Sequence, residues 1–240
     1  MTITLSIIIP CYNEAPLIIG LIQKVIDVKL SNNIEKEIII VNDHSTDNTG
    51  VLARNFIEVN PRLRIQLIDH TINKGKGASV RSGIEKATGD YIIIQDADHE
   101  YDPGEYNKLL KPMLDGHADV VYGSRFRGSE AHRVLFFFHS AGNRLLTFVS
   151  NLLTGLNLTD METGYKMFRT EILKSIRLRE NRFGFEPEVT AKISRVKNIR
   201  IYEIGISYYG RTYSEGKKIR WTDGLRALYC IIKYNILFRK

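Results

Sequence analysis

The 240-residue sequence predicts an α/β fold in which helices flank a mostly parallel central sheet. Short apolar segments with the composition of buried strands alternate with segments of helical spacing, a pattern typical of βαβ units. A cluster of polar residues follows each of the first four apolar segments. Because parallel strands end at the same edge of a sheet, these clusters are expected to meet where open α/β sheets bind ligands.

Four strands and three helices are expected in the first half of the chain. The apolar segments predict strands at residues 3–10, 37–41, 63–68 and 91–94. Helical spacing follows each of the first three strands. It predicts helices over residues 14–28, from a cap at Ser45 or Thr46 to residue 59, and from a glycine-rich turn at 73–78 to residue 87.

The second half of the chain is less regular. We expect a fifth strand at residues 118–122, an amphipathic helix at 133–153, a helix at 185–196 with Pro187 in its first turn, a strand at 198–206 and a last helix from Thr222.

Charge and cysteine content limit the possible partners and compartment. The net charge is +7 and the pI about 9.3, which suggests an anionic partner: nucleic acid, anionic lipid or a phosphorylated substrate. Cys11 and Cys230 have no metal-binding spacing, so a reducing compartment without disulfides is expected. No apolar stretch approaches the roughly 18 residues that span a bilayer. No charged leader precedes the first apolar segment, so no signal peptide is expected.

A group of acids follows the fourth predicted strand. Asp96 and Asp98 lie two residues apart, so on an extended backbone their carboxylates would point the same way. Two neighbouring carboxylates repel each other unless a cation lies between them, and Mg²⁺ typically takes one or two protein carboxylates together with substrate phosphate. Glu100 is a possible third ligand. These features favour a metal–diphosphate site, although a turn of solvated acids would have the same sequence.

Two common phosphate-binding motifs are excluded. The loop at residues 73–78 contains Gly75-Lys76-Gly77 but lacks the glycine and hydroxyl positions of a P-loop. No G-x-G-x-x-G follows the first strand, which disfavours a dinucleotide-binding fold. The loop either contacts a phosphate or forms a tight turn before a helix.

The polar clusters, taken together, resemble the successive motifs of family 2 glycosyltransferases, which have the GT-A fold. The resemblance lies in residues 10–14, 41–47, 73–77 and 96–98, and is strengthened by 100–103 and 123–125. Within the family the chain is most similar to dolichyl-phosphate mannose synthases and bacterial polyprenyl-phosphate glycosyltransferases. Residues 211–217 are similar to the basic R…E-G-x-K pattern of that subgroup but lack its small residue between glycine and lysine. Residues 163–168 resemble a segment that lies near the donor sugar and acceptor.

The resemblance implies a role for each matching residue. Pro10, Tyr12 and Glu14 would line the nucleobase pocket, and Asp43 would bind the base. Lys74 and Gly75 would lie beside the nucleotide, Asp96 with its neighbour Ala97 would approach the ribose or metal, and Asp98 with Glu100 would hold Mg²⁺ or Mn²⁺ on the diphosphate. Taken singly, Tyr12 could instead be an edge residue of the core, Glu14 a first-turn helix acid and Asp43 a turn residue.

The resemblance also implies an activity and a domain organisation. A single GT-A domain would span residues 1–240, with nucleotide-sugar and metal binding in 1–125 and acceptor and membrane contact in 126–240. It would transfer a sugar, with inversion, from a GDP-mannose or UDP-hexose type of donor to a polyprenyl phosphate. Arg125, Arg211 and Lys217 would hold the two phosphates against their mutual repulsion.

Two other functions remain open. A glycosyltransferase acting on a saccharide hydroxyl would need a carboxylate base, for which Glu188 is the candidate; Glu186 and Glu188 could equally be first-turn helix acids. A non-catalytic basic module that binds membranes or partner proteins is the second. The cations at residues 211–220 could also form a nucleic-acid patch, but a metal site requires its own substrate, so no nucleic acid is expected.

The amphipathic helices predict how the protein meets a membrane. The apolar arc of residues 133–153 is wider than one core contact needs and is flanked by Arg133 and Arg144, which suits a helix lying in a bilayer interface. A buried helix or a dimer contact would explain the same pattern. The last helix is also amphipathic and basic, and could rest on an anionic bilayer or pack on the domain. We expect a cytoplasmic protein, peripheral on the cytosolic membrane face, with a homo-oligomer or separate membrane partner left open.

Overall fold

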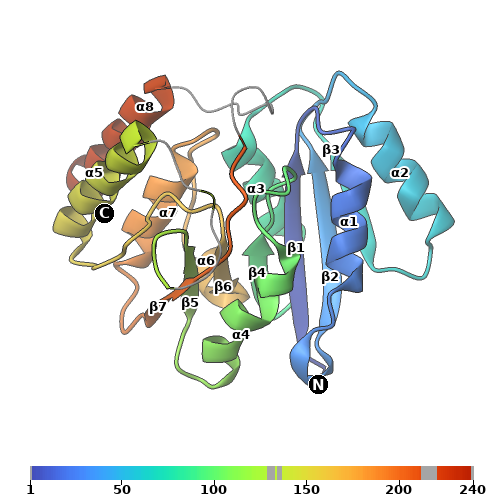
Figure 1. Cartoon of the computed structure of the whole chain (residues 1–240), viewed down its shortest axis with the longest axis horizontal. Helices are drawn as coiled ribbons and strands as arrows, with labels where there is room; N and C mark the ends of the chain where they lie inside the picture. Colours follow the sequence, from blue (N-terminus) through green and yellow to red (C-terminus); the bar gives the residue numbers. More distant parts are fainter. Residues whose placement is uncertain (1, 129–132, 134–136, 212–220, 239–240) are drawn as a thin grey trace.

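The computed structural model describes residues 2–128, 133, 137–211 and 221–238, and the statements below refer to these. A seven-stranded sheet forms its centre, in the order β3-β2-β1-β4-β6-β5-β7 (Figure 1). The strands are β1 Thr4–Cys11, β2 Glu35–Asn42, β3 Ile65–Asp69, β4 Tyr91–Ile94, β5 Val120–Ser124, β6 Lys166–Arg169 and β7 Ile201–Gly205. The α/β fold with a mostly parallel sheet is therefore confirmed.

The parallel half of the sheet has the strands that the sequence predicts. β1 pairs in parallel with both β2 and β4, and β2 pairs in parallel with β3. β6 lies antiparallel between β4 and β5, and was not predicted as a strand. Its four residues are too few to display the alternation of a strand, and three of them are buried. The first four polar turns thus share one edge, as expected.

Eight α-helices of the described residues cover the two faces of the sheet (Figure 1). They are α1 Ile18–Asp27, α2 Thr49–Val59, α3 Lys76–Lys86, α4 Tyr106–Leu114, α5 Phe137–Thr154, α6 Thr170–Ser175, α7 Phe185–Ile193 and α8 Trp221–Ile232. Short 3₁₀ turns lie at Ser31–Asn33 and Pro103–Glu105, and a π-helical turn, Lys233–Leu237, continues α8. The predicted cap at Ser45 or Thr46 is wrong, because α2 begins only at Thr49.

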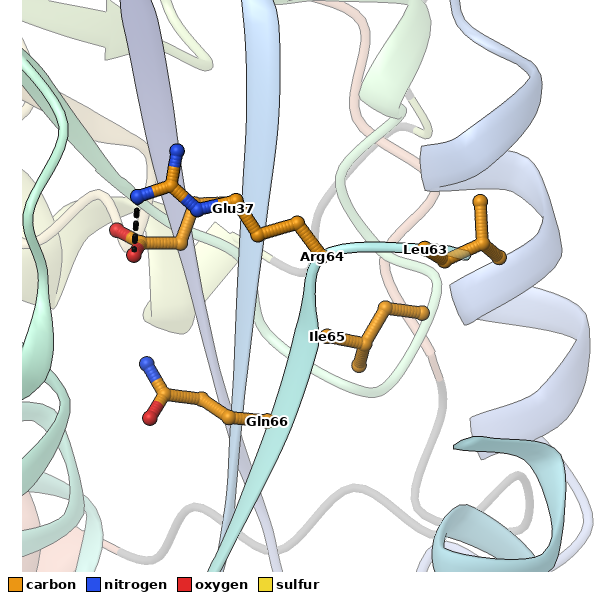
Figure 2. Close-up of a pocket in the computed structure, with 5 residues that line it drawn as sticks. All are labelled: Glu37, Leu63, Arg64, Ile65 and Gln66. Carbon is orange, nitrogen blue, oxygen red and sulfur yellow. Dashed lines mark hydrogen bonds and ion pairs between the residues drawn. The ribbon is translucent and has the colours of Figure 1, made fainter. Parts of the chain in front are cut away.

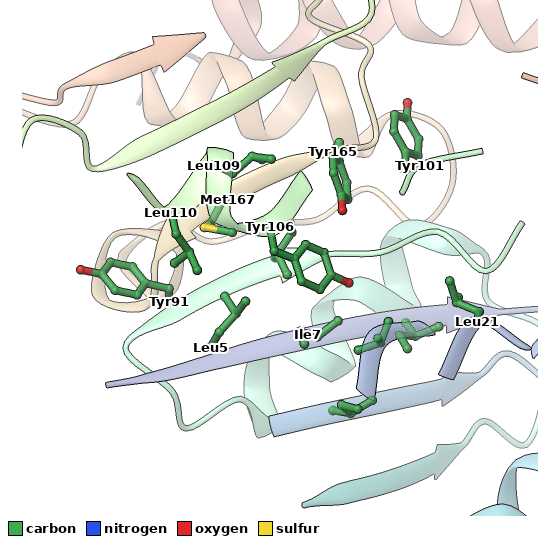
Figure 3. Packing of buried hydrophobic residues seen from close by; sticks show 14 of the residues in the cluster. Leu5, Ile7, Leu21, Tyr91, Tyr101, Tyr106, Leu109, Leu110, Tyr165 and Met167 are labelled. Atoms are coloured by element: carbon green, nitrogen blue, oxygen red, sulfur yellow. The ribbon is translucent and has the colours of Figure 1, made fainter. Parts of the chain in front are cut away.

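Alternate residues of the buried strands pack into two separate cores. Ile7 and Ile9 of β1 belong to one core with α1 and α4, whereas Ile8 lies in the other with α3 and α7. Figure 3 shows part of the first core, where tyrosine rings lie among aliphatic side chains. The rings of Tyr101 and Tyr165 stack with centroids 5.0 Å apart. This packing fixes the loop after β4 against β6.

Helices α5 and α8 turn apolar side chains outward. On α5, Thr147 and Ser150 are buried, while Leu145, Phe148 and Leu152 are 62%, 65% and 72% exposed. On α8 and its continuation, Leu225, Tyr229, Ile232 and Ile236 are among the exposed large apolar and aromatic residues. The two helices pack side by side (Figure 1), so we call these seven residues the outward apolar face. Val134 of the predicted stripe, and Phe136, which widens the predicted apolar arc, lie outside the described residues.

Polar contacts explain why α5 turns this way. Asn143 donates to Asp160 Oδ1 at 3.0 Å, and the Thr147 hydroxyl accepts from the Met161 backbone at 3.1 Å. The polar side of α5 thereby contacts the loop before β6. Leu146, Val149 and Leu153 pack against the second core, and the rest of the apolar arc faces away from the domain. Among the described residues, none of the helices combines the length and hydropathy that crossing a bilayer requires.

The closest approach of a helix to the sheet predicts a stability effect. A Cβ built on Gly83 of α3 would lie 2.4 Å from Ile8 Cγ2 of β1. We expect Gly83→Ala to lower the free energy of unfolding by about 1–3 kcal/mol, because the buried Ile8 must move. Urea unfolding followed by circular dichroism measures this change.

A matched control separates packing from helix propensity. Gly142 also lies inside a helix, and a Cβ there would meet nothing within 4 Å. Gly142→Ala should leave stability unchanged or raise it by up to about 1 kcal/mol. Equal effects of the two substitutions would contradict the close packing of α3 on β1.

Candidate active site

The turns after β1 and β2 are joined by direct hydrogen bonds. The Asn13 backbone donates to Ser45 Oγ at 3.1 Å, and its side-chain oxygen accepts from the Thr46 backbone at 2.8 Å. The Glu14 backbone donates to Thr49 Oγ1 at 2.9 Å. Ser45 and Thr46 therefore bind the neighbouring turn instead of capping α2. These contacts place the predicted nucleobase residues side by side with the end of β2.

Asp43 organises the glycine-rich loop before α3. Its carboxylate accepts hydrogen bonds from the backbone nitrogens of Lys74 at 2.9 Å and Gly75 at 2.6 Å, and contacts His70 Nδ1 at 2.7 Å. Gly75 has a φ of +95°, and a Cβ there would lie 2.5 Å from the Asn181 carbonyl oxygen. Only glycine fits this position without strain. Asp43, Lys74 and Gly75 are thus brought together, and the Asp43 carboxylate, expected to bind the base, is engaged by the loop and by His70.

Lys76, at the start of α3, bridges two acids from different elements. Its Nζ lies 2.9 Å from Asp96 Oδ1, after β4, and 3.1 Å from Glu186 Oε1 of α7. Burial alone would lower the pKa of Lys76, but the charges of Asp96 and Glu186 raise it well above its usual value. Lys76 therefore stays charged and neutralises Asp96. No role had been predicted for Lys76, because only the fold shows that it faces Asp96.

Arg211, which follows β7, lies close to three further acids of the predicted site. Its guanidinium lies 3.0 Å from Asp98 Oδ2, 3.6 Å from Glu100 Oε1 and 3.7 Å from Glu14 Oε2. The Arg211 backbone nitrogen donates to Glu100 Oε1 at 2.8 Å, and Tyr208 Oη donates to Glu100 Oε2 at 2.6 Å. Four predicted site residues thus meet at one point, and Arg211 is their shared cation.

The paired acids have the electrostatic properties that a cation site requires. Burial, followed by the charges of Asp96 and Glu100, raises the pKa of Asp98 from 3.8 to about 7, although Arg211 lowers it in part. Hard carboxylate oxygens are the ligands that Mg²⁺ prefers. The described residues contain no ready-made cage of three or more His, Cys, Asp or Glu side chains, because Lys76 and Arg211 already engage these carboxylates. The donor set fits a divalent cation, with Asp96, Asp98 and Glu100 as its candidate ligands.

The local backbone differs from the expectation. β4 ends at Ile94, and Ala97 and Asp98 lie in a turn, so the side-chain alternation of a strand does not apply to Asp96 and Asp98. His99 has a φ of +59°, and its Nε2 lies 3.0 Å from the Leu17 carbonyl oxygen. The turn sends Asp96 to Lys76 and Asp98 to Arg211.

Arg125, predicted to hold phosphate, forms a buried ion pair. Its Nε and NH2 donate to Asp160 at 2.7 and 2.8 Å, and its guanidinium lies 5.2 Å from the centre of the Tyr208 ring. Burial alone would lower the pKa of Arg125, but Asp160 raises it well above its usual value. Asp160 was not predicted as a functional residue. A buried bidentate pair of this kind fixes the position of both groups.

The predicted base Glu188 is engaged in structural contacts of its own. Glu188 is fully buried in α7, where it accepts hydrogen bonds from the backbone nitrogens of Arg179 and Glu180 and from Lys192. These contacts are those of a structural carboxylate, and they give no support to Glu188 as a catalytic base. Lys217 lies outside the described residues. Pro10 is the last residue but one of β1, within the sheet, and Tyr12 just beyond the strand is 38% exposed.

A pocket at the opposite edge of the sheet is distinct from this site. It has a volume of about 270 Å³ and is lined by Glu37, Leu63, Arg64, Ile65 and Gln66 (Figure 2). These residues lie at or near the amino ends of β2 and β3, whereas the acids follow the carboxyl ends. Glu37 accepts hydrogen bonds there from Ser6 and Thr88, so its charge is satisfied internally.

The sheet, the joined turns and the acids after β4 form a candidate ligand site, and comparison with known families shows the class of protein to which it belongs. The model of glycosyl transferase family 2 matches residues 6–177. The chain therefore belongs to this family and is a glycosyltransferase.

Curated relatives indicate which branch of the family the chain resembles. It is 27% identical over 94% of its length to the UDP-N-acetylglucosamine–dolichyl-phosphate N-acetylglucosaminyltransferase of Methanococcus voltae, of which it covers 94%. It is 25% identical over 90% of its length to the dodecaprenyl-phosphate galacturonate synthase of Rhizobium johnstonii, covering 62% of that protein. It is 27% identical over 99% of its length to the dolichyl-phosphate β-glucosyltransferase ALG5A of Trichomonas vaginalis, covering 75%.

Solved structures show the same fold. The glucosyl-3-phosphoglycerate synthase of Mycobacterium tuberculosis, crystallised with Mn²⁺, UDP and glucosyl-3-phosphoglycerate, matches with a TM-score of 0.70 and 17% identity, over 97% of this chain and 80% of that one. The same enzyme with Mg²⁺ and UDP gives a TM-score of 0.67. The GT-A fold is thus confirmed.

The raised pKa of Asp98 predicts a pH-dependent stability. A carboxyl that binds its proton more tightly when folded makes stability fall as the pH rises from about 4 to about 7. In the metal-free protein we therefore expect Asp98→Asn to raise the free energy of unfolding by roughly 1–3 kcal/mol at pH 8, and to change it little at pH 4. Urea unfolding at both pH values measures this difference.

The control is Glu58→Gln, which changes an exposed carboxylate of α2. It should leave the pH dependence of stability unchanged. A destabilised Asp98→Asn protein at pH 8 would contradict the assigned electrostatics of the acid group.

Proposed function

We propose that this glycosyltransferase moves a sugar, with inversion, from a nucleotide-diphospho-sugar to a polyprenyl phosphate at the cytosolic face of a membrane. The observation that carries the proposal is the meeting of Glu14, Asp98 and Glu100 with Arg211, from separate elements, at the carboxyl edge of the parallel strands. The relatives that act on dolichyl or dodecaprenyl phosphate support the acceptor class.

Donor binding is assigned to the edge formed by β1, β2 and β4. Pro10, Tyr12 and Glu14 line the base pocket in this proposal, while Asp43 holds the loop of Lys74 and Gly75 beside the nucleotide. Asp96 with its neighbour Ala97 would approach the ribose or metal, and Asp96, Asp98 and Glu100 would hold Mg²⁺ or Mn²⁺. When bound, the cation neutralises the departing diphosphate as a Lewis acid and template.

The acceptor phosphate is assigned to the basic side of the same site. A phosphate monoester is already ionised near neutral pH, so it attacks the anomeric carbon without a strong general base. Its charge must be held close to a negatively charged donor, which requires cations. Arg211 is the described residue best placed for this, with Lys217 further along the same segment. Arg125 supports the site through Asp160 and the Tyr208 ring.

The outward apolar face supports attachment to an anionic bilayer. Its seven large side chains come from two adjacent helices and are 40–72% exposed. The exposed residues Arg144 and Arg226 lie on these two helices. An amphipathic helix with basic residues beside an apolar face is typical of peripheral proteins that rest on anionic lipid. A second copy of the chain on this face is the alternative.

Turnover tests the metal and acceptor assignments together. With Mn²⁺, a nucleotide sugar and a short-chain polyprenyl phosphate, wild-type protein should form a lipid-linked sugar. Asp98→Ala should lower kcat/KM at least about 100-fold, because the diphosphate loses its cation. Chelation with EDTA should have the same effect.

Asp115→Ala, which changes an exposed aspartate of the same chain, should retain full activity. Activity of Asp98→Ala within a few-fold of wild type would remove the proposed metal site. Transfer only to a saccharide hydroxyl would instead support the alternative acceptor.

Vesicle flotation tests the membrane assignment. The double variant Phe148→Ser/Leu152→Ser should bind vesicles of phosphatidylcholine and phosphatidylglycerol at least about tenfold more weakly than wild type, because it lacks two exposed apolar side chains that would enter the bilayer. Val51→Ser/Val59→Ser on α2, where both valines are also exposed, should bind as wild type does. Unchanged flotation of the α5 variant would reject the membrane assignment. A wild-type dimer that the α5 substitutions dissociate, and the α2 substitutions do not, would also reject it.

A further inference from the structure

Glu180, in the loop before α7, anchors α8 and its continuation to the domain. The Glu180 side chain is buried, and its Oε1 accepts hydrogen bonds from Lys233 Nζ and Tyr234 Oη, both at 2.7 Å. Its Oε2 accepts from the Arg226 guanidinium, also at 2.7 Å. Burial alone would raise the pKa of Glu180, but these three hydrogen bonds lower it to about 2. Glu180 is therefore an ionised carboxylate whose side-chain donors come from α8 and the turn that continues it.

The backbone of the same residue closes over the glycine-rich loop before α3. A Cβ on Gly77 would lie 2.4 Å from the Glu180 carbonyl oxygen. A Cβ on Gly75 would lie 2.5 Å from the carbonyl oxygen of Asn181, the next residue. The Ala78 backbone nitrogen donates to that Asn181 oxygen at 3.1 Å. Because the two backbones are in direct contact, a shift of the Glu180 segment must displace the glycine-rich loop.

The cations that bind Glu180 also border the outward apolar face. The Arg226 guanidinium lies 5.2 Å, and Lys233 Nζ 5.8 Å, from the centre of the Tyr229 ring. Tyr229 is one of the exposed residues of that face. Glu180 thus connects the surface assigned to the membrane with the loop assigned to the nucleotide, through its side chain on one side and its backbone on the other.

We propose that Glu180 is a positioning residue that couples α8 to the glycine-rich loop, so that attachment of α8 to an anionic bilayer strengthens binding of the nucleotide donor. The inference rests on the proposed function, which supplies both ligands. A bilayer binds α8 with its apolar side chains turned outward, the orientation that the contacts with Glu180 fix. The nucleotide binds the loop against which Glu180 packs. Since both ligands favour one arrangement of Glu180, each strengthens the binding of the other.

Nucleotide binding with and without vesicles tests this inference. The probes are UDP and GDP with Mn²⁺, measured by calorimetry, and vesicles of phosphatidylcholine and phosphatidylglycerol at a concentration where flotation shows the protein to be bound. Wild-type protein should bind the nucleotide that it accepts at least about fivefold more tightly on vesicles than in solution. The nucleotide should strengthen vesicle binding by the same factor, because coupling between two binding sites is reciprocal.

Two variants test whether the coupling passes through Glu180. Glu180→Gln removes the charge that holds α8, and Lys233→Met removes one of its three donors while Arg226 and Tyr234 remain. On vesicles and in solution, each folded variant should bind the nucleotide with affinities that agree within about twofold. Lys233→Met carries the test if Glu180→Gln does not fold. Lys111→Met, which removes an exposed lysine of α4, is the control and should keep the wild-type gain.

A purely structural role of Glu180 would lower the melting temperature of both variants and leave the vesicle effect in place. Variants that keep the gain would therefore overturn this inference, as would wild-type protein that binds nucleotide and vesicles with no gain or with a loss; the proposed function would stand in either case. Failure of wild-type protein to bind UDP or GDP, or to bind the vesicles, would overturn the proposed function and this inference with it.

Discussion

The site depends on holding several carboxylates close together in a partly buried place. Asp96, Asp98 and Glu100 follow one strand, and burial, together with repulsion from the other two acids, raises the pKa of Asp98. Buried charges persist only when cations or hydrogen bonds compensate them. Lys76 and Arg211 supply those cations in the protein itself. The site is therefore organised around charge compensation, and a divalent cation and phosphates would extend the same principle.

The fold brings these charges together from distant parts of the chain. The glycine-rich loop held by Asp43 starts α3 and so delivers Lys76. The antiparallel β6 between β4 and β5 carries residues 160–165 across the acids, where Asp160 fixes Arg125. The stacked rings of Tyr101 and Tyr165 join the two segments. A site built from four elements is thus fixed by one hydrogen-bonded and aromatic framework.

The sequence predicts the local features well and the long-range ones poorly. The strands of the parallel half, including 91–94, are strongly apolar and can be recognised in the sequence. The polar residues that follow them indicate the turns that meet at one edge of the sheet. Periodicity predicts the apolar stripes of α5 and α8 but not their direction, which the contacts of Asn143 and Thr147 decide. β6 is too short to be recognised, and the turn at Asp98 depends on His99 reaching Leu17. The pairings of Lys76 with Asp96 and of Asp160 with Arg125 depend on contacts between residues far apart in the sequence.

The central claim is that the acids after β4 hold a divalent cation on the diphosphate of an activated sugar. Anomalous scattering from crystals grown with Mn²⁺ and UDP or GDP tests it most directly. The account predicts one Mn²⁺ peak within about 2–2.3 Å of an Asp98 carboxylate oxygen and in contact with the diphosphate. Bound nucleotide with no Mn²⁺ peak beside Asp98, or a peak held by other residues, would contradict it.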